Sequence, residues 1–208
     1  MSDELPELPP EAFLKEDASP DALFYTQPRF VTHIDESAVA AVTELYRALF
    51  PAGGTVLDLM GSWVAHLPPE IEYAEVIGHG MNDEELKANP RYTRYFIQDL
   101  NTNPVLPLAD ASIDAAAICV SVQYLEHPVA VFREVRRLLK PGGVFVITFS
   151  NRCFPTKAMA IWLHIPMGEH PRLVALYLDR AGFASIEPQV VIPPGLPEDP
   201  LWAVVGRV

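Results

Sequence analysis

Two kinds of hydrophobic pattern alternate along the chain. Apolar residues recur every three or four positions over Ser37–Phe50, Val129–Leu139 and about Pro171–Arg180, which predicts three amphipathic helices. A shorter helix is expected over Asp83–Ala88, just before a proline that would end it. Between these helices lie short, nearly continuous apolar runs that indicate strands buried on both faces: Thr55–Met60, Ala74–Gly78, Tyr95–Gln98, Ile113–Ser121 and Val144–Phe149.

The order of these elements predicts the fold class. Strands that alternate with helices favour a parallel sheet with helices on both of its faces. The last two expected strands, Ala184–Ile192 and Trp202–Val208, have no helix between them. They should pair as an antiparallel hairpin at one edge, because a parallel connection needs a longer crossover. We therefore expect an α/β fold with a mostly parallel sheet and an antiparallel C-terminal hairpin.

The pattern also predicts how the chain is divided. Residues 1–22 are acidic, rich in proline and without apolar periodicity, so we expect a flexible N-terminal arm. Residues 23–208 show no internal repeat or linker, and one domain suits a chain of 208 residues. The N-terminus lacks the basic head and apolar middle of a signal peptide, which favours a cytoplasmic protein.

Charge and composition narrow the partners. The chain has 15 basic and 27 acidic residues, a formal net charge of −12, so its surface should repel nucleic acid. No apolar run approaches the roughly 18 residues of a membrane span. Cys119 and Cys153 are expected to be buried free thiols. Neither these cysteines nor His164 and His170 have partners at the spacing of metal ligands. We therefore predict no metal site.

Acidic residues follow two of the expected strands. In open α/β sheets, ligands bind at the carboxyl ends of the strands, near the point where the strand order reverses. Asp58 lies at the end of the first strand, before a turn that can hold a charged amino group; an ordinary βα turn is the alternative. Asp99 follows the third strand, where its carboxylate can accept from an exocyclic amine; capping of the next turn is the alternative.

A longer block is more specific than either acid. Leu106–Asp114 (LPLADASID) leads into an apolar strand, Ser121–Leu125 (SVQYL) follows it, and Leu138–Gly143 (LLKPGG) comes after the next helix. With the first acidic turn, this order is similar to the class I S-adenosylmethionine-dependent methyltransferases of the type 11-like group, from about Thr55 to Ser150. The resemblance implies an enzyme with a Rossmann-like, seven-stranded sheet, S-adenosyl-L-methionine as cofactor and a small molecule as methyl acceptor.

Further runs resemble a set of uncharacterised methyltransferase-like proteins. They are RFVTHID (Arg29–Asp35), DLMGSW (Asp58–Trp63), GHGMN (Gly78–Asn82), SVQYL and FSNRCF (Phe149–Phe154).

The resemblance assigns residues to the cofactor. The first turn would face its methionine part, the second turn its ribose, the third its adenine, and the residue after the fourth strand its sulfonium. The residues that would face the methionine part are Asp58, Met60, Gly61 and Ser62, and those beside the ribose are Gly80, Met81 and Asn82. Asp99 and Leu100 would flank the adenine, and Ser121 would lie near the sulfonium.

This chain departs from the family pattern at two places. The family's first turn resembles DxGxGxG, and here its three glycine places read Met60, Ser62 and Val64. Side chains there crowd the backbone approach that glycine permits, although the Ser62 hydroxyl could donate to the cofactor carboxylate. The acid that usually takes the ribose hydroxyls is replaced by Gly80, for which Asn82 or Asp83 could substitute.

The acceptor side rests on residues outside the family motifs. His33 precedes the first long helix, where a lid would lie, and is the candidate general base; packing or capping is the alternative. The neighbouring Asp35 could orient its ring or raise its pKa. The substrate-binding candidates are Tyr25, Arg29, Tyr124 and Asn151, with a surface salt bridge as the alternative for the arginine.

The apolar segment Ala158–Ile165 favours a core-packed helix, although it could also cover the acceptor or form a homodimer face.

Two alternatives to a methyltransferase come from other classes of function. A non-catalytic binding or scaffold protein that keeps the fold is supported by the altered glycine turn. A nicotinamide-dependent oxidoreductase is disfavoured, because no GxGxxG follows the first strand and no tyrosine is followed four residues later by lysine.

Overall fold

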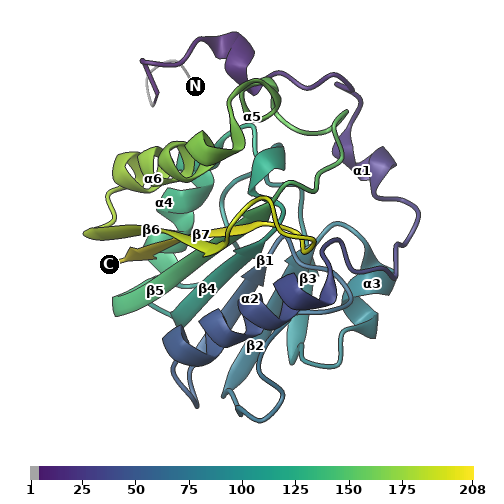
Figure 1. The fold of residues 1–208 in the computed structure, drawn as a ribbon. Helices are drawn as coiled ribbons and strands as arrows, with labels where there is room; N and C mark the ends of the chain where they lie inside the picture. Colours follow the sequence, from purple (N-terminus) through teal and green to yellow (C-terminus); the bar gives the residue numbers. More distant parts are fainter. Residues whose placement is uncertain (1–4) are drawn as a thin grey trace.

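The computed structural model describes residues 5–208, which contain one mixed, seven-stranded sheet (Figure 1). The strands are β1 (Thr55–Leu59), β2 (Glu75–Gly80), β3 (Arg94–Ile97), β4 (Ile113–Cys119), β5 (Leu139–Ser150), β6 (Ser185–Ile192) and β7 (Leu201–Arg207). Their order is β3-β2-β1-β4-β5-β7-β6, and β7 pairs antiparallel with both β5 and β6. The predicted Rossmann-like sheet with its antiparallel C-terminal hairpin is confirmed.

Helices cover both faces of the sheet (Figure 1). They are α1 (Asp21–Phe24), α2 (Glu36–Leu49), α3 (Asp83–Ala88), α4 (Pro128–Leu138), α5 (Ala160–His164) and α6 (His170–Ala181), with 3₁₀ turns η1 (Pro10–Phe13), η2 (Val122–Tyr124) and η3 (Met167–Glu169). Helix α2 begins where the Asp35 carboxylate accepts from the Ala38 amide at 2.8 Å. Helix α6 ends at Gly182, whose φ of 86° suits glycine.

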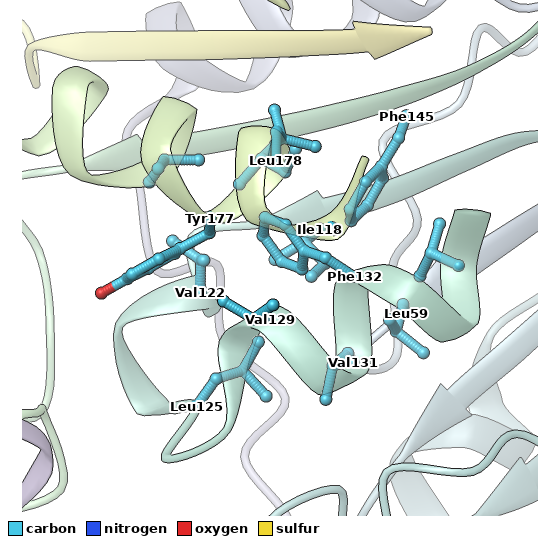
Figure 2. Packing of buried hydrophobic residues seen from close by; sticks show 14 of the residues in the cluster. Leu59, Ile118, Val122, Leu125, Val129, Val131, Phe132, Phe145, Tyr177 and Leu178 are labelled. Carbon is cyan, nitrogen blue, oxygen red and sulfur yellow. The ribbon is translucent and has the colours of Figure 1, made fainter. Parts of the chain in front are cut away.

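Alternate strand residues face opposite sides and build two apolar clusters. One lies between the sheet and helices α4 and α6 (Figure 2); it includes Leu59, Ile118, Val122, Leu125, Val129, Val131, Phe132, Phe145, Tyr177 and Leu178. The other lies under α2 and includes Ala38, Val42, Tyr46, Val56, Ala115, Ala117 and Val146. Because both faces are covered, the strands read as continuous apolar runs in the sequence.

Strand β5 starts five residues earlier than Val144, where the sequence analysis placed it. Leu139 already pairs with Ile113, and a bulge between Ile113 and Ala115 takes up the change of register. The Lys140 ammonium group also contacts the Asp114 carboxylate at 2.8 Å. The Pro-Gly-Gly part of the LLKPGG run therefore belongs to the strand.

The N-terminal segment differs from the solvated arm that we expected. From residue 5 onward it lies against the core, with Leu5, Ala12 and Phe13 buried. The Lys157 ammonium group, whose side chain is 1% exposed, contacts the carboxylates of Asp17 and Asp21 at 3.0 and 3.3 Å. Burial and ion pairing thus attach residues 5–22 to the sheet domain. The division into an arm and a single domain stays a prediction.

Three smaller expectations concern side chains and membranes. Cys119 and Cys153 are both free thiols, but they are half-buried rather than buried as expected. Trp162 of α5 is buried and stacks on His170 with ring centroids 3.9 Å apart, as a core-packed helix requires. Within residues 5–208, no helix combines the length and hydropathy needed to cross a bilayer.

Candidate active site

A cavity lies at the carboxyl ends of β1, β2, β3 and β4. The strand order runs outward from β1 to β3 and then returns to β4, so the strand order reverses between β1 and β4. This is the place where open α/β sheets bind ligands. We call the turns after these four strands the floor. Residues 21–33 and Phe154, which line the other side, are the roof.

Asp58 is the buried acid of the floor. The residue is 3% exposed, and within the described chain its carboxylate accepts one hydrogen bond, from the Tyr92 hydroxyl at 2.7 Å. Burial raises the pKa of Asp58 to about 7, and the Tyr92 hydrogen bond only partly opposes this. A cation in the cavity would favour the ionised carboxylate, so the site suits a ligand that carries an ammonium group.

The turn after β1 keeps a glycine-like backbone at Met60, although all three of the family's glycine places are substituted. Met60, at the first glycine place, has a φ of 58°, in the left-handed region that costs a side chain roughly 1–2 kcal/mol. Gly61 is required sterically, because a Cβ there would lie 2.7 Å from Asp58 Oδ2 and would also clash with the Tyr92 hydroxyl.

Two further residues with positive φ line the cavity, His66 at 50° and Val120 at 46°. Strained backbone of this kind is concentrated at binding sites.

His79 links the first two turns of the floor. Its Nδ1 accepts from the Met60 amide at 3.0 Å, and its carbonyl oxygen accepts from the Gly61 amide at 2.7 Å. Its Nε2 therefore carries the hydrogen and donates to the Gln98 carbonyl at 3.0 Å. Burial lowers the pKa of His79 to about 4, so the ring is neutral. In the sequence, His79 stands within the GHGMN run but was assigned no role.

The second turn has Gly80 at the place of the family's ribose-binding acid. A Cβ on Gly80 would lie 2.6 Å from the Gly61 carbonyl oxygen, so the two turns pack directly on each other. The Asn82 side chain caps α3, accepting from the Glu85 amide at 3.1 Å, and donates to the Tyr25 carbonyl at 2.9 Å. Asp83 accepts from the Tyr95 hydroxyl at 2.9 Å. The side chains of both suggested substitutes are therefore already engaged.

Asp99 and Leu100 line the far end of the cavity. The Asp99 carboxylate accepts from the Asn101 amide at 3.0 Å and from the Thr102 hydroxyl at 2.9 Å. The turn-capping role considered from the sequence is therefore present. It does not exclude a ligand amine, because a carboxylate has about four acceptor positions.

His33 lies on the roof, with its ring centroid 5.4 Å from that of Phe154. Desolvation lowers the pKa of His33; Glu85 opposes this and Arg29 adds to it. The expected role of Asp35 is wrong: its carboxylate caps α2 and accepts from the Asp199 amide at 2.6 Å.

His66, which the sequence analysis passed over, also lines the cavity, and its buried Nδ1 has no hydrogen-bond partner. Burial and the nearby His33 lower the pKa of His66 to about 4.

The structure gathers nearly all of the predicted site residues in this one cavity. The lining includes Tyr25, Arg29, His33, Asp58, Met60, Gly61, Ser62, Gly80, Met81, Asn82, Asp99, Leu100, Ser121 and Tyr124. Asn151 is not part of the lining; its side-chain oxygen accepts from the Ser150 hydroxyl at 3.0 Å. Among residues 5–208, no cluster of three or more histidine, cysteine or acidic side chains is arranged to hold a metal ion.

Sequence comparison matches part of this chain to methyltransferases. A family model described as a methyltransferase domain matches residues 61–147. An uncharacterized methyltransferase from Mycobacterium sp. (strain KMS) is 28% identical over 173 residues, 76% of this chain and 60% of that protein. This chain is therefore similar to methyltransferases, with the family match over residues 61–147. It spans only 60% of the length of that relative.

Solved structures share the fold. A SAM-dependent methyltransferase from Archaeoglobus fulgidus matches with a TM-score of 0.62 at 15% identity, over 84% of this chain and 95% of that one. The cyclase SpnF matches with a TM-score of 0.62 at 16% identity, over 86% and 88% of the two chains. Since the second is named as a cyclase, the fold by itself does not fix the reaction.

The residues present fit the domain's cofactor, S-adenosylmethionine, at both of its ends. The buried Asp58 carboxylate needs a cation, which the cofactor's ammonium group provides, and Asp99 keeps free acceptor positions for adenine. The ribose end, where Gly80 replaces the acid, lacks the usual acceptor.

Proposed function

We propose that the protein is an S-adenosylmethionine-dependent methyltransferase that acts on a small molecule. The observation that carries this proposal is the buried Asp58 carboxylate at the switch point, facing the same cavity as Asp99. Asp58 would hold the cofactor's ammonium group, and Asp99 with Leu100 would hold adenine. Met60, Gly61, Ser62 and Ser121 would surround the methionine part, with Gly80, Met81 and Asn82 beside the ribose.

The cofactor supplies a methyl group that is already activated, so the protein mainly has to align an acceptor and exclude water. The roof supports a small acceptor, because it leaves one bounded cavity over the floor. Tyr25 and Tyr124 would contact the acceptor. His33 would take the acceptor's proton when it has one to lose, since its lowered pKa keeps the ring neutral at pH 7.

Calorimetric titration tests cofactor binding. Both S-adenosylmethionine and S-adenosylhomocysteine should bind at micromolar concentrations, and Asp58→Asn should weaken binding by about 100-fold because the ammonium loses its counter-charge. Asp114→Asn is the matched control, since Asp114 contacts Lys140 and the Thr55 amide outside the cavity. Equal losses in both variants would contradict the assignment of Asp58.

The acceptor class needs a separate experiment. Label from methyl-tritiated S-adenosylmethionine should pass to a low-molecular-mass fraction of a cell extract. Transfer to the protein or nucleic-acid fraction would contradict a small-molecule acceptor. A homodimer and a cytoplasmic location stay predictions.

A non-catalytic scaffold is the second candidate function. It is favoured by the second turn, where Gly80 replaces the ribose-binding acid and the Asn82 side chain is engaged. The same titration separates the two proposals: absence of heat with either ligand at high micromolar concentration would support the scaffold.

A further inference from the structure

Arg29 is a half-buried cation that forms no ion pair with any carboxylate of residues 5–208. Its Nη2 donates to the Phe24 carbonyl at 2.9 Å, while its Nη1 is buried and has no hydrogen-bond partner. Among the described residues that line the cavity, it is the single arginine or lysine. The surface salt bridge considered from the sequence is therefore not what the structure shows.

The guanidinium group is held in place from its sides. Its central carbon lies 4.5 Å from the ring centroid of Phe24, 5.8 Å from that of Tyr25 and 5.4 Å from that of Phe154. The Arg29 amide also donates to Glu85 Oε1 at 2.6 Å. Ring faces attract the cation but accept no in-plane hydrogen bond from Nη1. The group is thus positioned, and one donor is left for a ligand.

Neighbouring acids are occupied by other groups. Asp21 pairs with Lys15 and Lys157, and Glu85 accepts from the Ser62 hydroxyl at 2.5 Å. An anion from outside the chain is the partner that the buried Nη1 lacks.

The donors expected for the cofactor carboxylate are not free. The Met60 and Gly61 amides both donate to His79, at 3.0 and 2.7 Å, and the Ser62 hydroxyl donates to Glu85. A carboxylate that enters above this turn must find a donor elsewhere.

We infer that Arg29 is the carboxylate-binding residue of this cavity and replaces the donors that the altered first turn withholds. The carboxylate belongs either to the cofactor or to the acceptor. The cofactor is favoured, because the donors of the turn after β1 are already bonded within the chain and leave its carboxylate without a partner there. This inference rests on the proposed function.

Three ligands and two variants test the inference. The ligands are S-adenosylhomocysteine, its analogue without the carboxylate (S-adenosyl-3-thiopropylamine), and phenylacetate added to protein saturated with S-adenosylhomocysteine. Arg29→Met keeps an unbranched apolar stem and removes the guanidinium group. Arg152→Met is the control, because Arg152 pairs with Asp199 and does not line the cavity.

Arg29→Met should weaken S-adenosylhomocysteine binding by about 10- to 100-fold, because a charge-assisted hydrogen bond is lost, and leave the decarboxylated analogue within about threefold. Arg152→Met should change neither. If Arg29→Met spares both nucleosides but abolishes phenylacetate binding, the carboxylate is the acceptor's and Arg29 keeps its role.

The inference is overturned if no carboxylate ligand depends on Arg29 while the variant remains folded by circular dichroism. Failure of the proposed function looks different: the wild type then binds neither nucleoside. In that case, phenylacetate is titrated into the wild type and into Arg29→Met, both without nucleoside. Weaker binding by the variant would support the inference, and equal binding would overturn it.

Discussion

The floor and the roof of the cavity are built in different ways. The floor consists of turns at strand ends, where Asp58 accepts from Tyr92 and the Met60 and Gly61 amides donate to His79, at distances of 2.7 to 3.0 Å. The roof is a segment with little regular structure, attached through the buried Lys157 and Asp21. The turns after β2, β3 and β4 lie within residues 61–147, which match the family model, whereas the roof residues Arg29 and His33 lie outside that range.

The largest effect is expected at the attachment of the roof. Lys157→Met leaves the Asp21 carboxylate buried with one cation fewer, which should lower the free energy of unfolding by about 3–5 kcal/mol. Urea unfolding measures it. Arg172→Met, which breaks the exposed pair with Glu169, is the control and should cost less than about 1 kcal/mol. A similar small cost for Lys157 would mean that the roof is only loosely attached.

The steric requirement of the floor should give the next largest effect. Gly61→Ala forces a Cβ against Asp58 and Tyr92, so it should destabilise the protein by about 1–3 kcal/mol and weaken S-adenosylhomocysteine binding. Gly168→Ala has open space around the new Cβ and should change stability by less than about 1 kcal/mol. Thermal unfolding and calorimetry together check the pair. Equal behaviour of the two variants would remove the argument for a tightly packed turn.

The pH dependence of binding should show the charge on Asp58. With its pKa raised to about 7, the carboxyl is mostly neutral at pH 6 and mostly ionised at pH 8. Only the ionised form pairs with an ammonium group, so S-adenosylhomocysteine should bind about tenfold more tightly at pH 8 than at pH 6. Titrations at the two pH values measure this ratio, which Asp58→Asn should abolish. Tighter binding at the lower pH would contradict the assignment.

The smallest effect is expected at Met60. Met60→Gly relieves the left-handed backbone but loses the packing of a partly buried side chain, so stability should change by less than about 1 kcal/mol. Affinity for S-adenosylhomocysteine should stay within about threefold. A large gain in affinity would show that the methionine side chain obstructs the cavity.

The difference between floor and roof also explains what the sequence could predict. Buried parallel strands leave apolar runs, and an acid at the end of such a run, like Asp58, stands out. The contact between Lys157 and the carbonyl of Asp17 joins residues 140 positions apart, and both look like ordinary surface charges in the sequence. No role could be assigned to His79 from the sequence, because its role depends on two turns meeting.

A structure with S-adenosylhomocysteine bound tests the central claim most directly. The amino group should lie within hydrogen-bond distance of the Asp58 carboxylate, and the adenine amine should lie equally close to Asp99. Density for the ligand elsewhere, or an Asp58 that still contacts only Tyr92 while Met60 and Trp63 fill the space above it, would contradict the account.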